Sequence, residues 1–170
     1  SLMDDEEAQS TIREIRSAVK ILSANKIGAL LVIERDMGLN DISATGIQID
    51  GLITSDFLMN VFIPNTPLHD GAAVIRGKRL IAAGCLLPLT ENRSLSTELG
   101  TRHRAAIGLS EQCDALVVVV SEETGTISIA ENGRIHRHLD GDQLTHILTP
   151  AFAYGARSSI LDMIRSWRRK

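Results

Sequence analysis

The sequence has 170 residues, of which 44% are hydrophobic and 23% are charged, so its size and composition suit one domain with a substantial core. The net charge of −3 argues against a general attraction to nucleic acid, and the 3% of aromatic residues argues against stacked rings that bind single strands. The two cysteines, Cys85 and Cys113, are too few for a zinc ribbon and are expected to be reduced thiols.

No apolar run approaches the roughly 18 residues of a membrane span, and the acidic start lacks the core of a signal peptide. Because Ser1 and Leu2 precede Met3, the natural protein is expected to begin elsewhere. The sequence therefore predicts a cytoplasmic domain, and a membrane anchor in the full-length protein stays open.

The first half of the chain alternates helical and strand patterns. Residues 4–25 are predicted to form a helix, and the continuous apolar run 27–34 a buried strand. The polar stretch 35–46 is typical of a loop. Residues 54–62 are expected to form a short helix capped by Thr54 or Ser55, followed by a loop over 63–71.

The second half mixes hairpins with helices. Strands are predicted at 72–76, 79–89, 115–120, 126–130 and 134–139, with turns at Gly77-Lys78 and Asn132-Gly133. A helix capped by Thr101 is expected over 102–113 after a loop. From Gln143 the chain is predicted to be helical and interrupted near Pro150, with one final face formed by Ile160, Leu161, Ile164 and Trp167.

These elements predict an α/β fold: a single domain with a mixed β-sheet flanked by α-helices. We expect one domain over 1–170, with an N-terminal helix at 4–25, a core at about 18–139 and a helical extension at 140–170.

Residues 69–72, here called the His-Asp cluster, place a titratable pair before a buried strand. Asp70 could hold a metal or orient a hydroxyl for attack, and Gly71 and Ala72 would let a ligand approach the backbone. The alternative is a capped turn that enters a strand. A metal-dependent phosphohydrolase with a His-Asp pair is a poor match, because that family is all-helical.

Residues 101–104, here called the basic cluster, place Arg102, His103 and Arg104 at the start of a helix, after Thr101. Backbone N–H groups at a helix start bind anions, and phosphate is the natural guest. Cations are unfavourable at this positive end of the helix dipole unless an anion compensates them. The alternative is a solvated basic turn.

Residues 121–123, here called the acidic turn, follow the most apolar predicted strand. Polar residues after a buried strand often line the ligand crevice of an α/β sheet. Glu123 is a candidate metal ligand, whereas Glu122 fits an ordinary acidic turn. His136 and His138 are interpreted as an exposed strand face rather than a metal site.

The three clusters together resemble the diadenylate cyclase family. The motifs His-Asp-Gly-Ala (69–72), Gly-Thr-Arg-His-Arg-Ala-Ala (100–106) and Val-Ser-Glu-Glu-Thr-Gly (120–125) occur in that family's order, and the resemblance extends from about Ala18 to Leu139. It is closest to the small, single-domain cyclases. The resemblance implies a mixed sheet flanked by helices, and the condensation of two ATP molecules into cyclic di-AMP and two pyrophosphates.

The resemblance also implies a divalent metal (manganese, magnesium or cobalt), and two subunits that face each other with one ATP each. Asp70, Gly71 and Ala72 would then be catalytic, together with the three residues Arg102, His103 and Arg104. The ATP-binding residues would be Leu87, Thr101, Arg102, His103, Arg104, Ser121 and Glu123, with Leu87 packing on adenine. The metal would be held by His69, Asp70 and Glu123.

Two rival functions stay open at this point: a nucleotide-binding regulator without turnover, and a scaffold whose polar clusters are only surface. The intact Asp70 and basic cluster argue against the regulator. The function of 140–170 lies outside the resemblance, and packing on the core or pairing with another subunit is expected.

Overall fold

The structure is a computed structural model that describes residues 4–168, and their side chains except those of 153–163 and 165–166. Seven strands form one sheet: β1 (Ala29–Ile33), β2 (Ile47–Leu52), β3 (Ala72–Arg76), β4 (Arg79–Cys85), β5 (Leu116–Val120), β6 (Ile127–Glu131) and β7 (Arg134–His136). Their order is β2-β4-β3-β1-β5-β6-β7, and β1 pairs in parallel with β3 but antiparallel with β5. The expected mixed sheet is confirmed.

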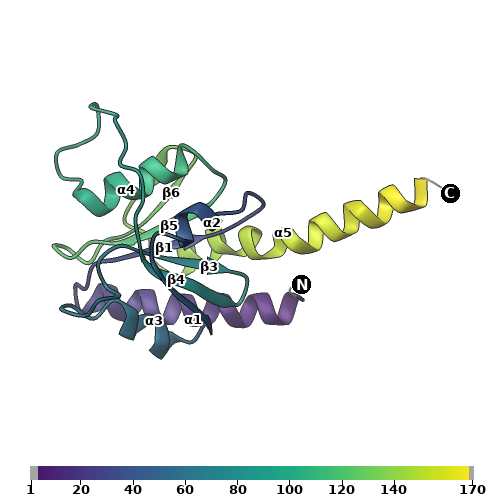
Figure 1. Ribbon diagram of the computed structural model, residues 1–170, viewed down its shortest axis with the longest axis horizontal. Helices are drawn as coiled ribbons and strands as arrows, with labels where there is room; N and C mark the ends of the chain where they lie inside the picture. Colours follow the sequence, from purple (N-terminus) through teal and green to yellow (C-terminus); the bar gives the residue numbers. More distant parts are fainter. Residues whose placement is uncertain (1–3, 169–170) are drawn as a thin grey trace.

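Helices cover both faces of this sheet: α1 (Asp5–Ala24), α2 (Asn40–Ser43), α3 (Ser55–Val61), α4 (Thr101–Ser110) and α5 (Gly141–Arg168). Figure 1 shows α4 on one side of the sheet and α1 and α3 on the other. The apolar face of α1, including Ile12 and Ile15, packs with Val118 and Val120 of β5. The alternate residues Val117 and Val119 pack under α4 with Ile107. The sheet is thus buried on both faces, which explains the continuous apolar runs in β1 and β5.

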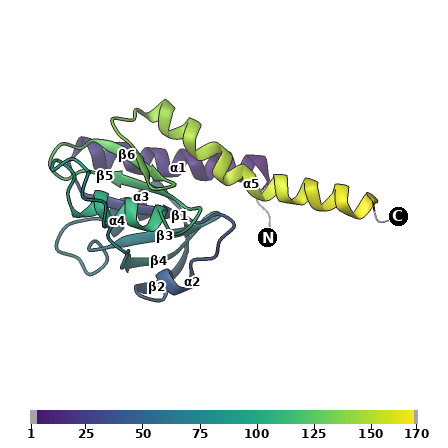
Figure 2. The ribbon, with the colours of Figure 1, turned by 90° about the horizontal axis from the view of Figure 1, so that it is seen from above.

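The helix α5 begins against the core and then leaves it. Leu144 and Leu148 are fully buried, whereas Ile164 and Trp167 are 42% and 72% exposed. Figures 1 and 2 both show the end of α5 projecting beyond the rest of the chain. The predicted common face of this segment includes Ile160 and Leu161, whose side chains lie outside the described residues.

Several predicted boundaries are wrong. The helix α5 is not interrupted near Pro150 but continues through it, although the proline has no N–H to donate to the preceding turn. The helix α2 lies within the predicted loop. The strand β2 was not predicted; it is an irregular edge strand, in which Asp50 has a positive φ and the register shifts between Gln48 and Gly51. The strand β4 ends at Cys85, after Gly84 with φ +66°, and not at residue 89.

Two further corrections concern the site and its surroundings. The residue that caps α4 is Gly100, which has no side chain to offer, and Thr101 is already helical. The strand β7 ends at His136 rather than at 139, and His138 has a φ of +59°, a left-handed conformation that breaks a strand.

Candidate active site

The three polar clusters lie at the same end of the central strands. Since β1 and β3 are parallel, the His-Asp cluster before β3 lies beside Gly28, which precedes β1. Since β5 is antiparallel to β1, the acidic turn after Val120 lies beside the start of β1, at the same end of the strands. Leu87 follows the neighbouring end of β4, where Cys85 pairs with Ala72. The order β4-β3-β1-β5 therefore brings together segments that are far apart in the chain.

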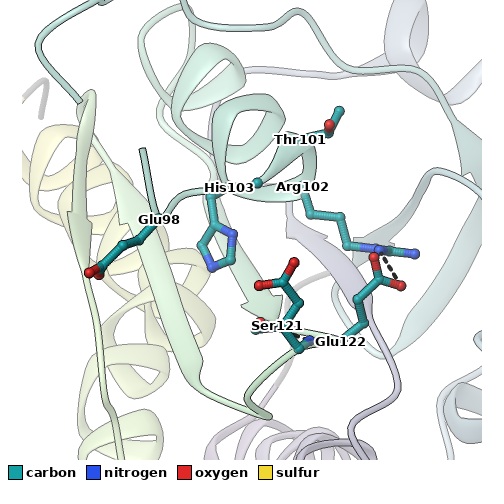
Figure 3. Close-up of a pocket in the computed structure, with 8 residues that line it drawn as sticks. Glu98, Thr101, Arg102, His103, Ser121 and Glu122 are labelled. Carbon is teal, nitrogen blue, oxygen red and sulfur yellow. Dashed lines mark hydrogen bonds and ion pairs between the residues drawn. The ribbon is translucent and has the colours of Figure 1, made fainter. Parts of the chain in front are cut away.

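A cavity of about 100 Å³ opens where the start of α4 meets the acidic turn, as Figure 3 shows. Five of its eight lining residues are among the predicted site residues: Thr101, Arg102, His103, Ser121 and Glu123. The other three, Glu98, Gly100 and Glu122, were not predicted.

The side chain of Arg102 lies across the backbone at Gly28. A Cβ atom at residue 28 would lie 2.6 Å from Cζ of Arg102, so the close approach requires a glycine. The Nη1 of Arg102 forms an ion pair with Oε2 of Glu122 at 3.3 Å, drawn as a dashed line in Figure 3. The Arg102 charge is thus held at the mouth of the cavity by one exposed carboxylate.

His103 is only 5% exposed, yet neither of its ring nitrogens has a hydrogen-bond partner among the described residues. Burial lowers the pKa of His103, and the charges of Arg137 and Arg102 lower it further, against an opposing effect of Glu123. The ring is therefore held neutral, with one N–H donor and one lone pair. A buried polar group without a partner is unusual and points to a ligand at this position.

The first turn of α4 adds backbone donors to the same cavity. Its cap, Gly100, is exposed and makes no side-chain hydrogen bond to the turn, which contains no acidic residue. The free N–H groups of a helix start, together with a neighbouring arginine, favour an anion such as phosphate.

The acidic turn is organised by Ser121. Its Oγ accepts hydrogen bonds from the backbone N–H groups of Glu123 at 3.2 Å and Thr124 at 3.3 Å. The carbonyl of Ser121 also accepts a hydrogen bond from the N–H of Gly125, whose φ is +75°. The hydroxyl proton of Ser121 stays available to a ligand, because both bonds use the oxygen as acceptor.

The His-Asp cluster is shaped by close backbone contact with β4. Gly71 has a φ of +122°, and a Cβ there would lie 2.7 Å from the carbonyl oxygen of Cys85. Asp70 before it is exposed, and its carboxylate has no hydrogen-bond or ion-pair partner among the described residues. Ala72 is fully buried and begins β3. This geometry presents the Asp70 carboxylate to an approaching ligand.

The cavity wall does not include six of the predicted residues: His69, Asp70, Gly71, Ala72, Leu87 and Arg104. Arg104 lines a separate hollow formed with the loop at 90–93, where the N–H of Thr90 donates to the carbonyl of Arg104 at 3.1 Å. Leu87 packs partly against the core under α4, whereas its neighbour Leu86 is 70% exposed.

The predicted metal ligands offer suitable donors but no closed site. In the part of the chain that the structure describes, no three His, Cys, Asp or Glu side chains form a group that could hold a metal. The Nδ1 of His69 lies 2.5 Å from the carbonyl oxygen of Thr66 and donates to it, so Nε2 is the ring nitrogen that remains for a ligand. This nitrogen and the adjacent Asp70 carboxylate fit a divalent cation whose remaining ligands come from a phosphate.

Sequence reasoning missed residues that reach the site from elsewhere in the chain. Glu98 precedes the basic cluster and could have been suspected from its position. Gly28 and Arg137 carry no local signal, because their role depends on which strands are neighbours. Arg137 follows β7, and its Nη1 lies 3.5 Å from Oε2 of Glu98.

Comparison with known proteins identifies the family to which this sequence is similar. A family model described as "DisA bacterial checkpoint controller nucleotide-binding" matches residues 16–135. The cyclic di-AMP synthase CdaA of Bacillus subtilis is 47% identical over 155 residues, which is 91% of this chain and 57% of that protein. The chain thus spans little more than half the length of this curated relative.

Two solved structures share the fold. A double mutant of DacA from Staphylococcus aureus superposes with a TM-score of 0.84 at 42% identity, covering 86% of this chain and 98% of the other. A "hypothetical membrane spanning protein" from Bacillus cereus gives a TM-score of 0.73 at 45% identity, covering 75% and 63%. Among the residues described here, no helix combines the length and hydropathy needed to span a membrane.

Proposed function

Because this chain belongs to the diadenylate cyclase family, we propose that it condenses two ATP molecules into cyclic di-AMP and releases two pyrophosphates. The observation that carries the proposal is the buried, neutral His103 without a partner, beside Arg102 and the free start of α4. This arrangement is suited to the phosphates of a nucleotide.

Each bond of the product forms when a ribose 3′-oxygen attacks an α-phosphorus and the bond from that phosphorus to the pyrophosphate oxygen breaks. The attacking hydroxyl must lose its proton, and the exposed Asp70 carboxylate would assist this loss. Negative charge grows on the phosphoryl group and on pyrophosphate, where Arg102, His103 and the helix start would stabilise it. Arg104 would contribute from the adjacent hollow.

The substrate-contacting roles are proposed from the family resemblance. Gly71 and Ala72 would let ATP approach the backbone, Ser121 and Thr101 would donate to phosphate, and Leu87 would pack on adenine. A divalent metal, for which manganese, magnesium and cobalt are the candidates, would be held by His69, Asp70 and Glu123 with help from the phosphates. When bound, it would neutralise phosphate charge.

We further propose that the active form is a homodimer in which two ATP-loaded sites face each other, since one site holds only one of the two reacting nucleotides. The exposed Asp70 and the open cavity suit a site completed from outside the subunit. We also propose that the full-length protein is membrane-associated, because one structural neighbour is described as membrane spanning.

Thin-layer chromatography of ATP incubated with the protein and manganese tests the proposal against its two rivals. A cyclase converts ATP to a dinucleotide, whereas a non-catalytic regulator binds ATP without product. A scaffold would not bind, and would lack the thermal stabilisation of roughly 2.7 kcal/mol that ATP at about 100 times its Kd confers.

A further inference from the structure

Three polar side chains near α4 have buried atoms without hydrogen-bond partners among the described residues. These atoms are both ring nitrogens of His103, the hydroxyl of Ser128 and the Nε of Arg137. Ser128 is fully buried and His103 nearly so. Since buried polar groups are almost always paired, this set indicates a polar ligand that extends beyond the cavity wall.

The sheet brings Ser128 and Arg137 to the same place. Ser128 pairs with Val119 of β5, whose side chain packs under α4, so both point to the α4 side of the sheet. Ser128 precedes Ile129, and Arg137 follows the partner of Ile129, so the two lie at one level of the β6–β7 ladder. Arg137 forms an ion pair with Glu98, and Glu98 lines the cavity together with His103, so the guanidinium lies beside this cavity.

Two ion pairs flank His103. On one side Arg102 pairs with Glu122 at 3.3 Å, and on the other Arg137 pairs with Glu98 at 3.5 Å. Figure 3 shows His103 between Glu98 and the Arg102–Glu122 pair. The side chains of Glu98 and Glu122 are 76% and 66% exposed, so each carboxylate stays well solvated when a stronger anion replaces it.

We propose that Arg137 is a further phosphate-binding residue of this site, which binds the terminal phosphates of ATP in exchange for Glu98. The inference rests on the proposed function. The guanidinium of Arg137 offers several N–H donors in one plane, including the unpartnered Nε, and this fork suits phosphate oxygens. Ser128 supplies a hydroxyl behind it. Arg102 and Arg137 then hold the triphosphate from both sides of His103.

Equilibrium binding of 3′-deoxy-ATP and 3′-deoxy-AMP in magnesium tests this assignment, because neither nucleotide has the hydroxyl that reacts. Arg137→Gln is expected to weaken the binding of 3′-deoxy-ATP by about tenfold or more, which is the scale of a lost hydrogen bond to a charged group. The affinity for 3′-deoxy-AMP should change by less than about threefold, since the lost contact is to the terminal phosphates. Arg137→Lys keeps the charge but loses Nε, so its affinity for 3′-deoxy-ATP should lie between those of wild type and Arg137→Gln.

Glu98→Gln provides an independent test on an exposed residue. It removes the carboxylate that competes for Arg137, so 3′-deoxy-ATP should bind tighter than to wild type while 3′-deoxy-AMP is unchanged. Arg134→Gln is the matched control for Arg137→Gln, because Arg134 is exposed at the start of β7 and its loss lowers the net charge by the same amount.

The inference is overturned if Arg137→Gln weakens the binding of both nucleotides equally, or weakens the binding of neither. If Arg137→Gln does not fold, unchanged binding of 3′-deoxy-ATP by Glu98→Gln overturns it. A wild-type protein that binds no 3′-deoxy-ATP would contradict the proposed function itself, and the inference with it.

Discussion

The guanidinium of Arg102 lies against the α-carbon of Gly28, with only 2.6 Å between Cζ and the position that a Cβ would occupy. A glycine before β1 thereby fixes where the cation of the basic cluster can lie. Because the obstructing atoms belong to the end of a flexible side chain, a methyl group at residue 28 would displace Arg102 rather than the backbone.

Gly28→Ala is therefore expected to leave the melting temperature within a few degrees of wild type and to lower turnover of ATP by about tenfold, through loss of a positioned cation. Gly38→Ala is the control, since a Cβ there meets nothing within 4 Å. A large loss of stability in Gly28→Ala, or normal turnover, would contradict the account of this contact.

Removal of either arginine of the basic cluster should weaken ATP binding or turnover and leave the protein without ligand almost as stable as before. The pair of Arg102 with the exposed Glu122 is worth only about 0–1 kcal/mol, and a cation at the start of α4 opposes the helix dipole. Arg102→Ala and Arg104→Ala, with the exposed Arg13→Ala as control, would be compared by thermal unfolding and by KM. A fall of many degrees in the melting temperature would instead identify these arginines as structural.

His103 should make stability fall as the solution is acidified. Burial and the charges of Arg137 and Arg102 lower its pKa in the fold, so below the unfolded value of about 6.5 the unfolded chain takes up a proton that the folded protein excludes. The contribution of His103 to the free energy of unfolding is fully present above the unfolded pKa and is lost as the pH falls through the lower pKa of the folded protein.

The measurement is the melting temperature at about pH 7.5 and at about pH 5.5 for wild type and His103→Gln. The decrease on acidification should be smaller in His103→Gln, which has no proton to gain. An equal decrease in both proteins would show that His103 is not held neutral by the fold.

Local patterns were sufficient to predict the elements that are buried on both sides or strongly amphipathic. The run of four valines in β5 predicted a central strand, and the helical spacing of Ile12, Ile15, Val19 and Leu22 gave α1 its buried face. The strand β2 escaped prediction because it lies at the sheet edge, where Ile47 and Leu52 are about half exposed and burial imposes no pattern.

The same distinction applies to the site. Thr101, Arg102 and His103 are consecutive at a helix start, so their chemistry could be inferred from sequence. Gly28 and Arg137 are far apart in the chain, and only the order of the strands brings them to the basic cluster. The sequence shows that Glu122 is charged, but its ion pair with Arg102 depends on the distance between the end of β5 and the start of α4.

The proposed dimer predicts that the chemistry can be divided between subunits. If Asp70 serves the hydroxyl of the ATP bound to its own subunit, a wild-type subunit paired with Asp70→Asn can form only one of the two bonds. Such mixed dimers should release the linear dinucleotide pppApA, so linear product should rise and cyclic product fall as excess mutant is added.

Mass spectrometry of both products, at fixed ATP and manganese with co-expressed subunits, measures this division. If mixed dimers are demonstrated and the cyclic yield per wild-type subunit is unchanged with no linear species, Asp70 does not act in this way.

Identification of the products made from ATP, with manganese, magnesium and cobalt in turn, tests the proposed function most directly. Mass spectrometry and a pyrophosphate assay should find two pyrophosphates for each cyclic di-AMP. Asp70→Asn, which keeps the volume but loses the charge, should make at least about 100-fold less, whereas the exposed Asp56→Asn should match wild type. A folded wild-type protein that binds ATP but forms no dinucleotide with any of the three metals, or a normal rate in Asp70→Asn, would contradict the account.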